Sequence, residues 1–250
     1  MVTTGVYRFN PQRLVAEGVG WDIFTLFAAV PALLISLPWL SRGSMRARLF
    51  ALGILAYFAY QYLMYSVTWA LGPLFLLFIG IFVGSISALV WIISTLRISE
   101  LPRVVDTRFP RTGMGIFSLA IGILLIGMWL GLIIPALKGN IEGTLLGQTT
   151  LVVQALDLSI IVPLAFFTGA SVLRRRPIGY LLAPVLAIKG AAMGAAICAM
   201  VIVAWIVEQT SQIVPLSLFA VITVVSVFLA FRIYRSVAPG VTLADKGGEE

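Results

Sequence analysis

The sequence predicts an all-α membrane protein, a polytopic bundle of seven transmembrane helices with its N-terminus outside and its C-terminus in the cytoplasm. Composition is the first reason, because 60% of the 250 residues are hydrophobic and 11% are charged, whereas soluble domains are roughly 45–50% apolar and about 25% charged. The second reason is a set of seven apolar runs, each close to the roughly 20 residues that span a bilayer. The third is an alternation of basic residues between successive loops.

The apolar runs account for most of the chain, so we expect a single transmembrane domain over residues 1–235. Backbone amides inside a bilayer need partners within their own segment, which favours helices over isolated strands. The expected helices cover approximately residues 21–40, 48–67, 72–95, 113–137, 151–173, 178–206 and 213–234. Residues 236–250 are Gly-rich and charged, and we expect them to form a disordered cytoplasmic tail.

The segment before the first run contains a second, weaker helix pattern. Asn10 and Pro11 are typical of a cap followed by the first helical position, and Gly18 and Gly20 would end a helix that begins there. We therefore expect a short helix on the membrane surface, with a frayed tail as the alternative.

Arginine is concentrated in every second loop, which is the signature of cytoplasmic loops. The basic residues after the first, third, fifth and seventh runs are Arg42, Arg46, Arg48, Arg97, Arg103, Arg108, Arg111, Arg174, Arg175, Arg176, Arg232 and Arg235. The alternate loops hold only Lys138, although Arg8 and Arg13 near the N-terminus run against the pattern. The net charge of +7 thus indicates orientation in a cell membrane rather than nucleic-acid binding. The triplet Arg174, Arg175 and Arg176 is also a candidate contact for anionic lipid head groups.

When the chain is aligned with itself so that Pro31 falls on Pro163, the first run lies on the fifth without a gap. We call this alignment the repeat register. Its identities include Val30 with Val162, Pro31 with Pro163, Arg42 with Arg174, Leu49 with Leu181 and Ala51 with Ala183. The pattern predicts an internal repeat of two three-helix units that point the same way and are joined by the helix at 113–137. Parallel repeats of this kind occur in transporters.

This layout of three helices, one helix and three helices resembles that of SWEET sugar transporters and of the opsins. The resemblance is one of architecture only. No PQ-loop motif lies in a membrane span, and the run at 213–234 has no lysine to hold retinal as an opsin does. No functional residue is carried over from either family. The chain is similar in the same general way to uncharacterised multi-pass membrane proteins of prokaryotes.

Asp157 and Lys189 are the charged residues that lie deep inside apolar runs. Ionisable groups at membrane depth are costly and mark functional sites by default. Measured from the turn at residues 174–176, the two differ in depth by roughly 9 Å, and a lysine stem can cover much of that distance. We expect a ligand-binding or ion-pathway pair. The alternatives are a structural pair between two helices and a Schiff base with its counter-ion.

Two further features are candidates for function. Tyr57 and Gln61 share one face of the second run, where they either line a ligand site or belong to an interior hydrogen-bond network. Pro31 and Pro163 lie inside their runs and must kink them. In a transporter such kinks can serve as hinges, whereas elsewhere they only adjust packing.

The sequence offers little for catalysis or metal binding. It has no histidine, one cysteine (Cys198) and no paired deep carboxylates, so we expect no metal site, no cofactor and no enzyme activity. The favoured function is a small-molecule or ion transporter, or a ligand-binding bundle, with a mid-membrane polar site. The alternatives are a non-catalytic subunit or scaffold of a larger membrane complex and, third, a membrane enzyme with a lipid-like substrate. The expected partners are the bilayer, a small ligand, and other membrane proteins or a second copy of the chain.

Overall fold

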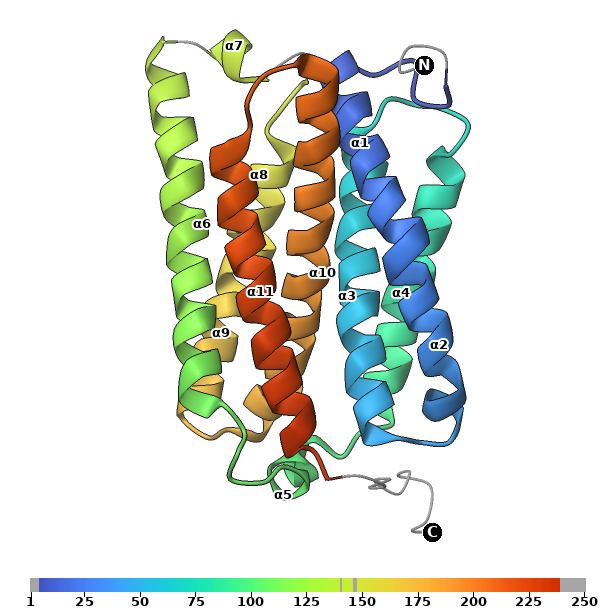
Figure 1. Ribbon diagram of the computed structural model, residues 1–250, viewed down its shortest axis with the longest axis vertical. Coiled ribbons are helices and arrows are strands. Elements are labelled where there is room, and N and C mark those ends of the chain that lie inside the picture. The colour runs from blue at the N-terminus through green and yellow to red at the C-terminus, as the bar shows by residue number, and fades with distance from the viewer. Residues whose placement is uncertain (1–4, 140, 146–147, 239–250) are drawn as a thin grey trace.

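The computed structural model describes residues 5–139, 141–145 and 148–238, which form a bundle of long helices (Figure 1). No β-strand occurs in these ranges, and the only strand-like pairing there is an isolated bridge between Val105 and Val237. The all-α prediction is therefore confirmed.

Seven helices in the described ranges are long and apolar enough to cross a membrane, as predicted. Two of them are built from three consecutive pieces. The spans are α1 (Gln12–Phe24) with η1 (Thr25–Ala29) and α2 (Val30–Ser41), then α3 (Met45–Thr68), α4 (Phe75–Ser94), α6 (Arg111–Gly139), α8 (Val152–Leu156) with η3 (Asp157–Ile161) and α9 (Val162–Leu173), α10 (Pro177–Glu208) and α11 (Ile213–Ser236). The short helices η2 (Ile98–Glu100), α5 (Leu101–Val104) and α7 (Ile141–Leu145) lie in connections.

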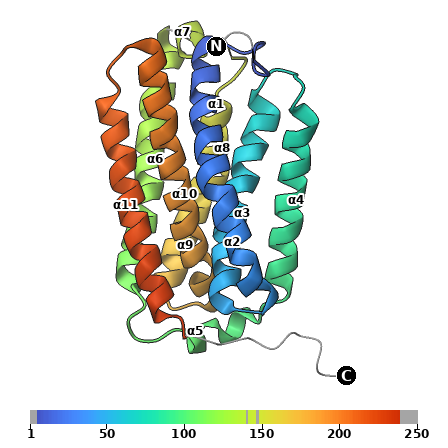
Figure 2. The same cartoon turned by 45° about the vertical axis from the view of Figure 1, so that its right-hand side comes forward.

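The first span begins earlier than the sequence pattern suggested. Helix α1 starts at Gln12 and continues through Gly18 and Gly20 into the bundle, instead of ending there as a separate surface helix. A Cβ atom at Gly20 would lie 2.5 Å from the Cα of Met200 in α10. The glycine is therefore a contact point between two helices rather than a helix stop, and Figure 2 shows α1 running beside α10.

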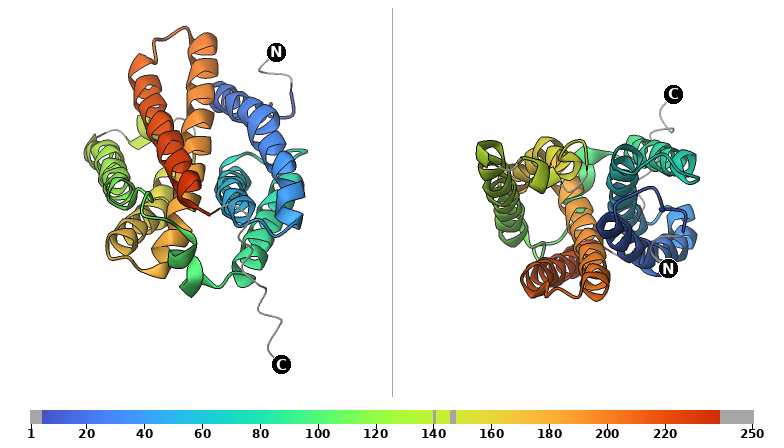
Figure 3. Two further views of the ribbon diagram at one scale, coloured as in Figure 1. Left: turned by 60° about the horizontal axis from the view of Figure 1, so that its bottom comes forward. Right: turned by 90° about the horizontal axis from the view of Figure 1, so that it is seen from above.

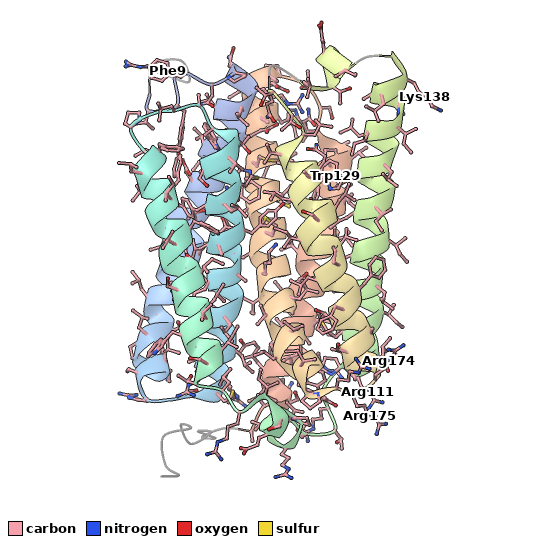
Figure 4. All side chains as sticks on the ribbon, turned by 180° about the vertical axis from the view of Figure 1, so that it is seen from behind. Phe9, Arg111, Trp129, Lys138, Arg174 and Arg175 are labelled. Atoms are coloured by element: carbon pink, nitrogen blue, oxygen red, sulfur yellow. The ribbon has the colours of Figure 1, made fainter. Side chains whose placement is uncertain are left out.

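The two ends of the bundle differ in charge. Figure 4 shows Arg111, Arg174 and Arg175 at one end, which we call the arginine end, and Phe9 and Lys138 at the other, which we call the opposite end. Successive spans run alternately between the two ends (Figure 1). This arrangement places the arginine-containing loops of the sequence together in space.

Helices α3 and α10 form the interior of the bundle. Helix α10 packs against α1, α3, α9 and α11, as the views along the bundle illustrate (Figure 3). Helix α3 is the least apolar of the seven spans found in the described ranges, yet 67% of its apolar stretch is buried, against 11% for α6. Its polar side chains thus face protein, while the apolar faces of the outer helices are left for lipid.

The two three-helix units have the same local geometry at positions that the repeat register aligns. In the first, the Val30 N–H bonds to the Thr25 carbonyl, closing the wide turn of the π-helix η1. In the second, the Val162 N–H bonds to the Asp157 carbonyl in η3. Each wide turn is followed by a proline, which has no N–H to offer the preceding turn, and π-helical turns of this kind are frequent at functional sites.

The following turns also match. Gly43 and Arg175 both have a positive φ, 74° and 57°. The Gly43 N–H bonds to the Leu40 carbonyl, as the Arg175 N–H bonds to the Val172 carbonyl, and the next residue in each turn bonds one position further back. In each unit the shared geometry therefore covers the π-helical turn of one span and the turn that follows that span.

The arginine end is closed by contacts between distant parts of the chain. Arg46 donates to the Val237 carbonyl from both Nε and Nη2, and the Asp106 N–H bonds to the Ser236 carbonyl. Residues 236–238 are thus ordered, although the expected disordered tail began at 236. The rest of that tail, residues 239–250, lies outside the described residues.

Candidate functional site

A cavity of about 620 Å³ extends from the opposite end of the bundle to its middle. It is lined by α1, α3, α6, η3, α10 and α11, and most of the lining side chains are apolar or aromatic. Arg13 and Glu17 lie at its outer end, and Tyr60, Asp157 and Lys189 lie deeper. Small-molecule sites have this size and this mixture of an apolar wall with a few polar groups.

Asp157 is held from two other helices. Tyr60 of α3 donates its hydroxyl to Oδ1 at 2.5 Å, and Trp129 of α6 donates Nε1 to Oδ2 at 2.9 Å. Figure 4 shows Trp129 beside the span that contains Asp157. Both carboxylate oxygens therefore have a protein donor, which fixes the orientation of the carboxylate in the cavity wall.

Lys189 lies about 18 Å from the start of α10 at 1.5 Å per residue, and its side chain is only 7% exposed. Its Nζ atom lies 4.3 Å from the centroid of the Tyr60 ring, a cation–π contact worth roughly 0.5–2 kcal/mol. Among the residues that the structure describes, none accepts a hydrogen bond from Nζ. An ammonium has three N–H donors, so Lys189 brings unused donors into the cavity wall.

The expected Asp157–Lys189 pair is present in an indirect form. The two side chains line the same cavity, but within the described ranges they form no direct ion pair. Tyr60 stands between them, with its hydroxyl on the carboxylate and its ring face under the ammonium. The three residues make one polar group that joins α3, η3 and α10.

Tyr57 and Gln61 lie outside the cavity wall. Tyr57 is fully buried, and its hydroxyl shares a 2.7 Å hydrogen bond with Thr25 Oγ1. Gln61 is 1% exposed, and neither polar atom of its side chain has a partner in the described part of the chain. The α3 side chains that line the cavity are Tyr60, Met64, Tyr65 and Thr68.

Tyr60 and Trp129 are the polar residues of the site that the sequence analysis did not select. Tyr60 had a usable signal, since Tyr60, Met64 and Thr68 follow the same spacing of four as Tyr57, Gln61 and Tyr65. Choosing between two adjacent faces of one helix requires knowing which neighbour each face meets. Trp129 had no such signal, because nothing local distinguishes it from a lipid-facing tryptophan.

The two candidate hinges occupy equivalent places. Pro31 is the second residue of α2 and Pro163 is the second residue of α9, each directly after a π-helical turn. Asp157 is the first residue of η3, so the second π-helical turn also positions the carboxylate. Arg174, Arg175 and Arg176 are exposed in the turn between α9 and α10, away from the cavity.

Charged and aromatic residues cover the outer end of the cavity. Arg13 forms ion pairs with Glu17 at 3.1 Å and with Glu208 at 3.7 Å, which joins α1 to the end of α10. Nearby, Tyr7 donates to Asp22 Oδ2 at 2.6 Å. Burial, and then the Asp22 carboxylate, raise the pKa of Tyr7, so the phenol keeps its proton and its hydrogen bond.

Comparison with known proteins finds no match to a family model, to a curated protein or to a solved structure. The resemblance to SWEET transporters and opsins thus stays one of helix layout. Within the described residues, no three His, Cys, Asp or Glu side chains come together in a way that could hold a metal ion. Function has to be inferred from the cavity and its polar group.

Proposed function

We propose that this protein is a membrane transporter or ligand-binding bundle that takes a small, largely apolar molecule into the cavity between its two three-helix units. The observation that carries the proposal is a cavity of about 620 Å³ whose wall holds a buried lysine with no hydrogen-bond acceptor among the described residues. Unused donors in an apolar wall are costly unless a ligand supplies acceptors. If Asp157 and Lys189 served only to join two helices, they would not need a cavity beside them.

In this proposal the arginine end faces the cytoplasm, following the bias of Lys and Arg. The cavity then opens outward, while the contacts of Arg46 and Val105 with Val237 close the inner side. The matched kinks before Pro31 and Pro163 favour a parallel repeat whose units rock against each other. Such rocking would expose Lys189 to the two sides in turn.

The test fills the cavity without touching its polar group. In Leu125→Trp the new ring projects from α6 into the cavity, whereas in Ile123→Trp it projects from the exposed side of the same helix. After gentle purification, mass spectrometry should find a small molecule retained by the wild type and by Ile123→Trp and lost from Leu125→Trp. If nothing is retained and one protein partner co-purifies equally with all three, the function is that of a complex subunit.

A further inference from the structure

At the deep end of the cavity the two charges are of opposite sign. The hydrogen-bonding groups there are unequally satisfied. Asp157 and Lys189 are of opposite sign and lie on either side of the Tyr60 ring. The carboxylate already has a donor on each oxygen, whereas the ammonium has no acceptor among the described side chains. A ligand that fits this end must bring acceptor oxygen to Lys189.

A ligand could offer Lys189 either a carboxylate or an uncharged carbonyl oxygen, and the charge already present in the cavity favours one of the two. A carboxylate ligand would add an uncompensated negative charge to a cavity that is mostly apolar, and burying such a charge is expensive. A carbonyl oxygen accepts from the ammonium and adds no charge. The same reasoning excludes a cationic head group, because Lys189 would repel it.

The aromatic side chains of the cavity wall favour a planar body on the ligand. Tyr60 and Trp129 present rings beside Asp157, and Phe117 and Phe219 line the cavity from α6 and α11. Aromatic side chains pack well against flat conjugated surfaces in offset or edge-on arrangements. A saturated chain would fill the same space without that preference.

We infer that the site is built for an uncharged, largely apolar carbonyl compound with an aromatic or conjugated body, whose carbonyl oxygen accepts a hydrogen bond from Lys189. This inference rests on the proposed function and names its ligand class. Asp157 acts as a positioning and charge-balancing residue, and Tyr60 links it to the lysine. The binding is non-covalent, with the carbonyl bond left intact.

Three probes of one shape separate the head groups, namely 2-acetylnaphthalene, 2-naphthoate and 2-ethylnaphthalene. Binding to the full chain in nanodiscs is measured against empty nanodiscs, which removes the contribution of partition into lipid. We expect the ketone to bind about tenfold more tightly than the ethyl compound, as one hydrogen bond to a charged group provides. The naphthoate should bind more weakly than the ketone.

Two substitutions test the assignment from opposite directions. Lys189→Met should remove the advantage of the ketone over the ethyl compound. Asp157→Asn leaves an unbalanced positive charge, so it should raise naphthoate binding about tenfold or more and reverse the order of the two oxygen-bearing probes. This gain of binding cannot come from a variant that fails to fold.

The outcomes distinguish this inference from the proposed function. Equal binding of all three probes to the wild type, lost in Leu125→Trp, overturns the carbonyl assignment and leaves the cavity as a ligand site. Tighter binding of the naphthoate to the wild type overturns the charge-balance step. Absence of binding by every probe overturns the inference, while the mass-spectrometric comparison of Leu125→Trp with Ile123→Trp still decides the proposed function.

Discussion

The two three-helix units, α1–α4 and α8–α11, share a backbone pattern and differ in what it holds. In the first unit the π-helical turn begins with Thr25, which bonds directly to Tyr57 on the next helix. At the positions that the repeat register aligns with these two stand Asp157 and Lys189, which do not bond directly and are separated by Tyr60. The same backbone pattern therefore holds a directly hydrogen-bonded neutral pair in the first unit and a charged pair separated by a tyrosine in the second.

The two units also differ in the size of their side chains at aligned positions. Phe58 and Tyr62 fill the first unit with aromatic rings, whereas their counterparts in the repeat register are Gly190 and Gly194, which line the cavity. A Cβ at Gly194 would lie 2.4 Å from Thr223 Oγ1, so these glycines also let α11 approach α10. At these positions the first unit is filled by aromatic rings, whereas the second unit has glycines that leave space for the cavity.

The largest effect is expected where α1 meets α10. Gly20→Val should destabilise the protein by about 3 kcal/mol, because its Cβ would overlap the backbone of Met200 and force the helices apart. Gly80→Val, on the open side of α4, is the matched control and should change stability by less than about 0.5 kcal/mol. Thermal unfolding in detergent measures both, and equal losses would mean that α1 does not pack closely on α10.

The charged group of the second unit should behave as one coupled unit. Asp157→Asn and Lys189→Met should each cost about 2 kcal/mol, because each leaves buried polar groups without their electrostatic or hydrogen-bond partners. The double variant should lose less than the two together, by about 1 kcal/mol, when unfolding is compared across the four proteins. Strict additivity would show that Tyr60 does not couple the two charges.

The neutral pair of the first unit should be weaker and purely structural. Thr25→Val strands the buried Tyr57 hydroxyl and should cost about 1 kcal/mol. Adding Tyr57→Phe removes the stranded group and should restore most of the loss. Neither variant should change binding of 2-acetylnaphthalene, and a change in that binding would place the first unit in the ligand site.

The smallest effect on stability is expected when Gln61 or Met193, which are aligned by the repeat register, is replaced by cysteine. The two cysteines should differ in their access to a reagent. Met193 lines the cavity and Gln61 does not. In a Cys198→Ala background, Met193→Cys should react with a membrane-impermeant maleimide added outside, and Gln61→Cys should not. Similar labelling of both would mean that the cavity does not reach Met193 from that side.

Much of the candidate site could be anticipated from the cost of charge in a membrane. Asp157 and Lys189 stand out because few residues carry charge at such depth, and both line the cavity. Tyr57 and Gln61 were chosen because they are polar, share one helix face and lie deep in their run. Spacing defines the faces of a helix but leaves open which face meets a cavity, and here the lining face begins with Tyr60.

The sequence by itself determined the class of the protein. Apolar runs of bilayer length must be helices, since their backbone groups have no other partners in lipid, and the two aligned prolines mark where two of those helices contain a π-helical turn. Tertiary structure decided the rest. The role of Gly20 as a contact with Met200, the contribution of Trp129 from α6, and the place of Tyr60 between two charges all depend on which helices are neighbours, and packing between distant segments leaves no periodic trace along the chain.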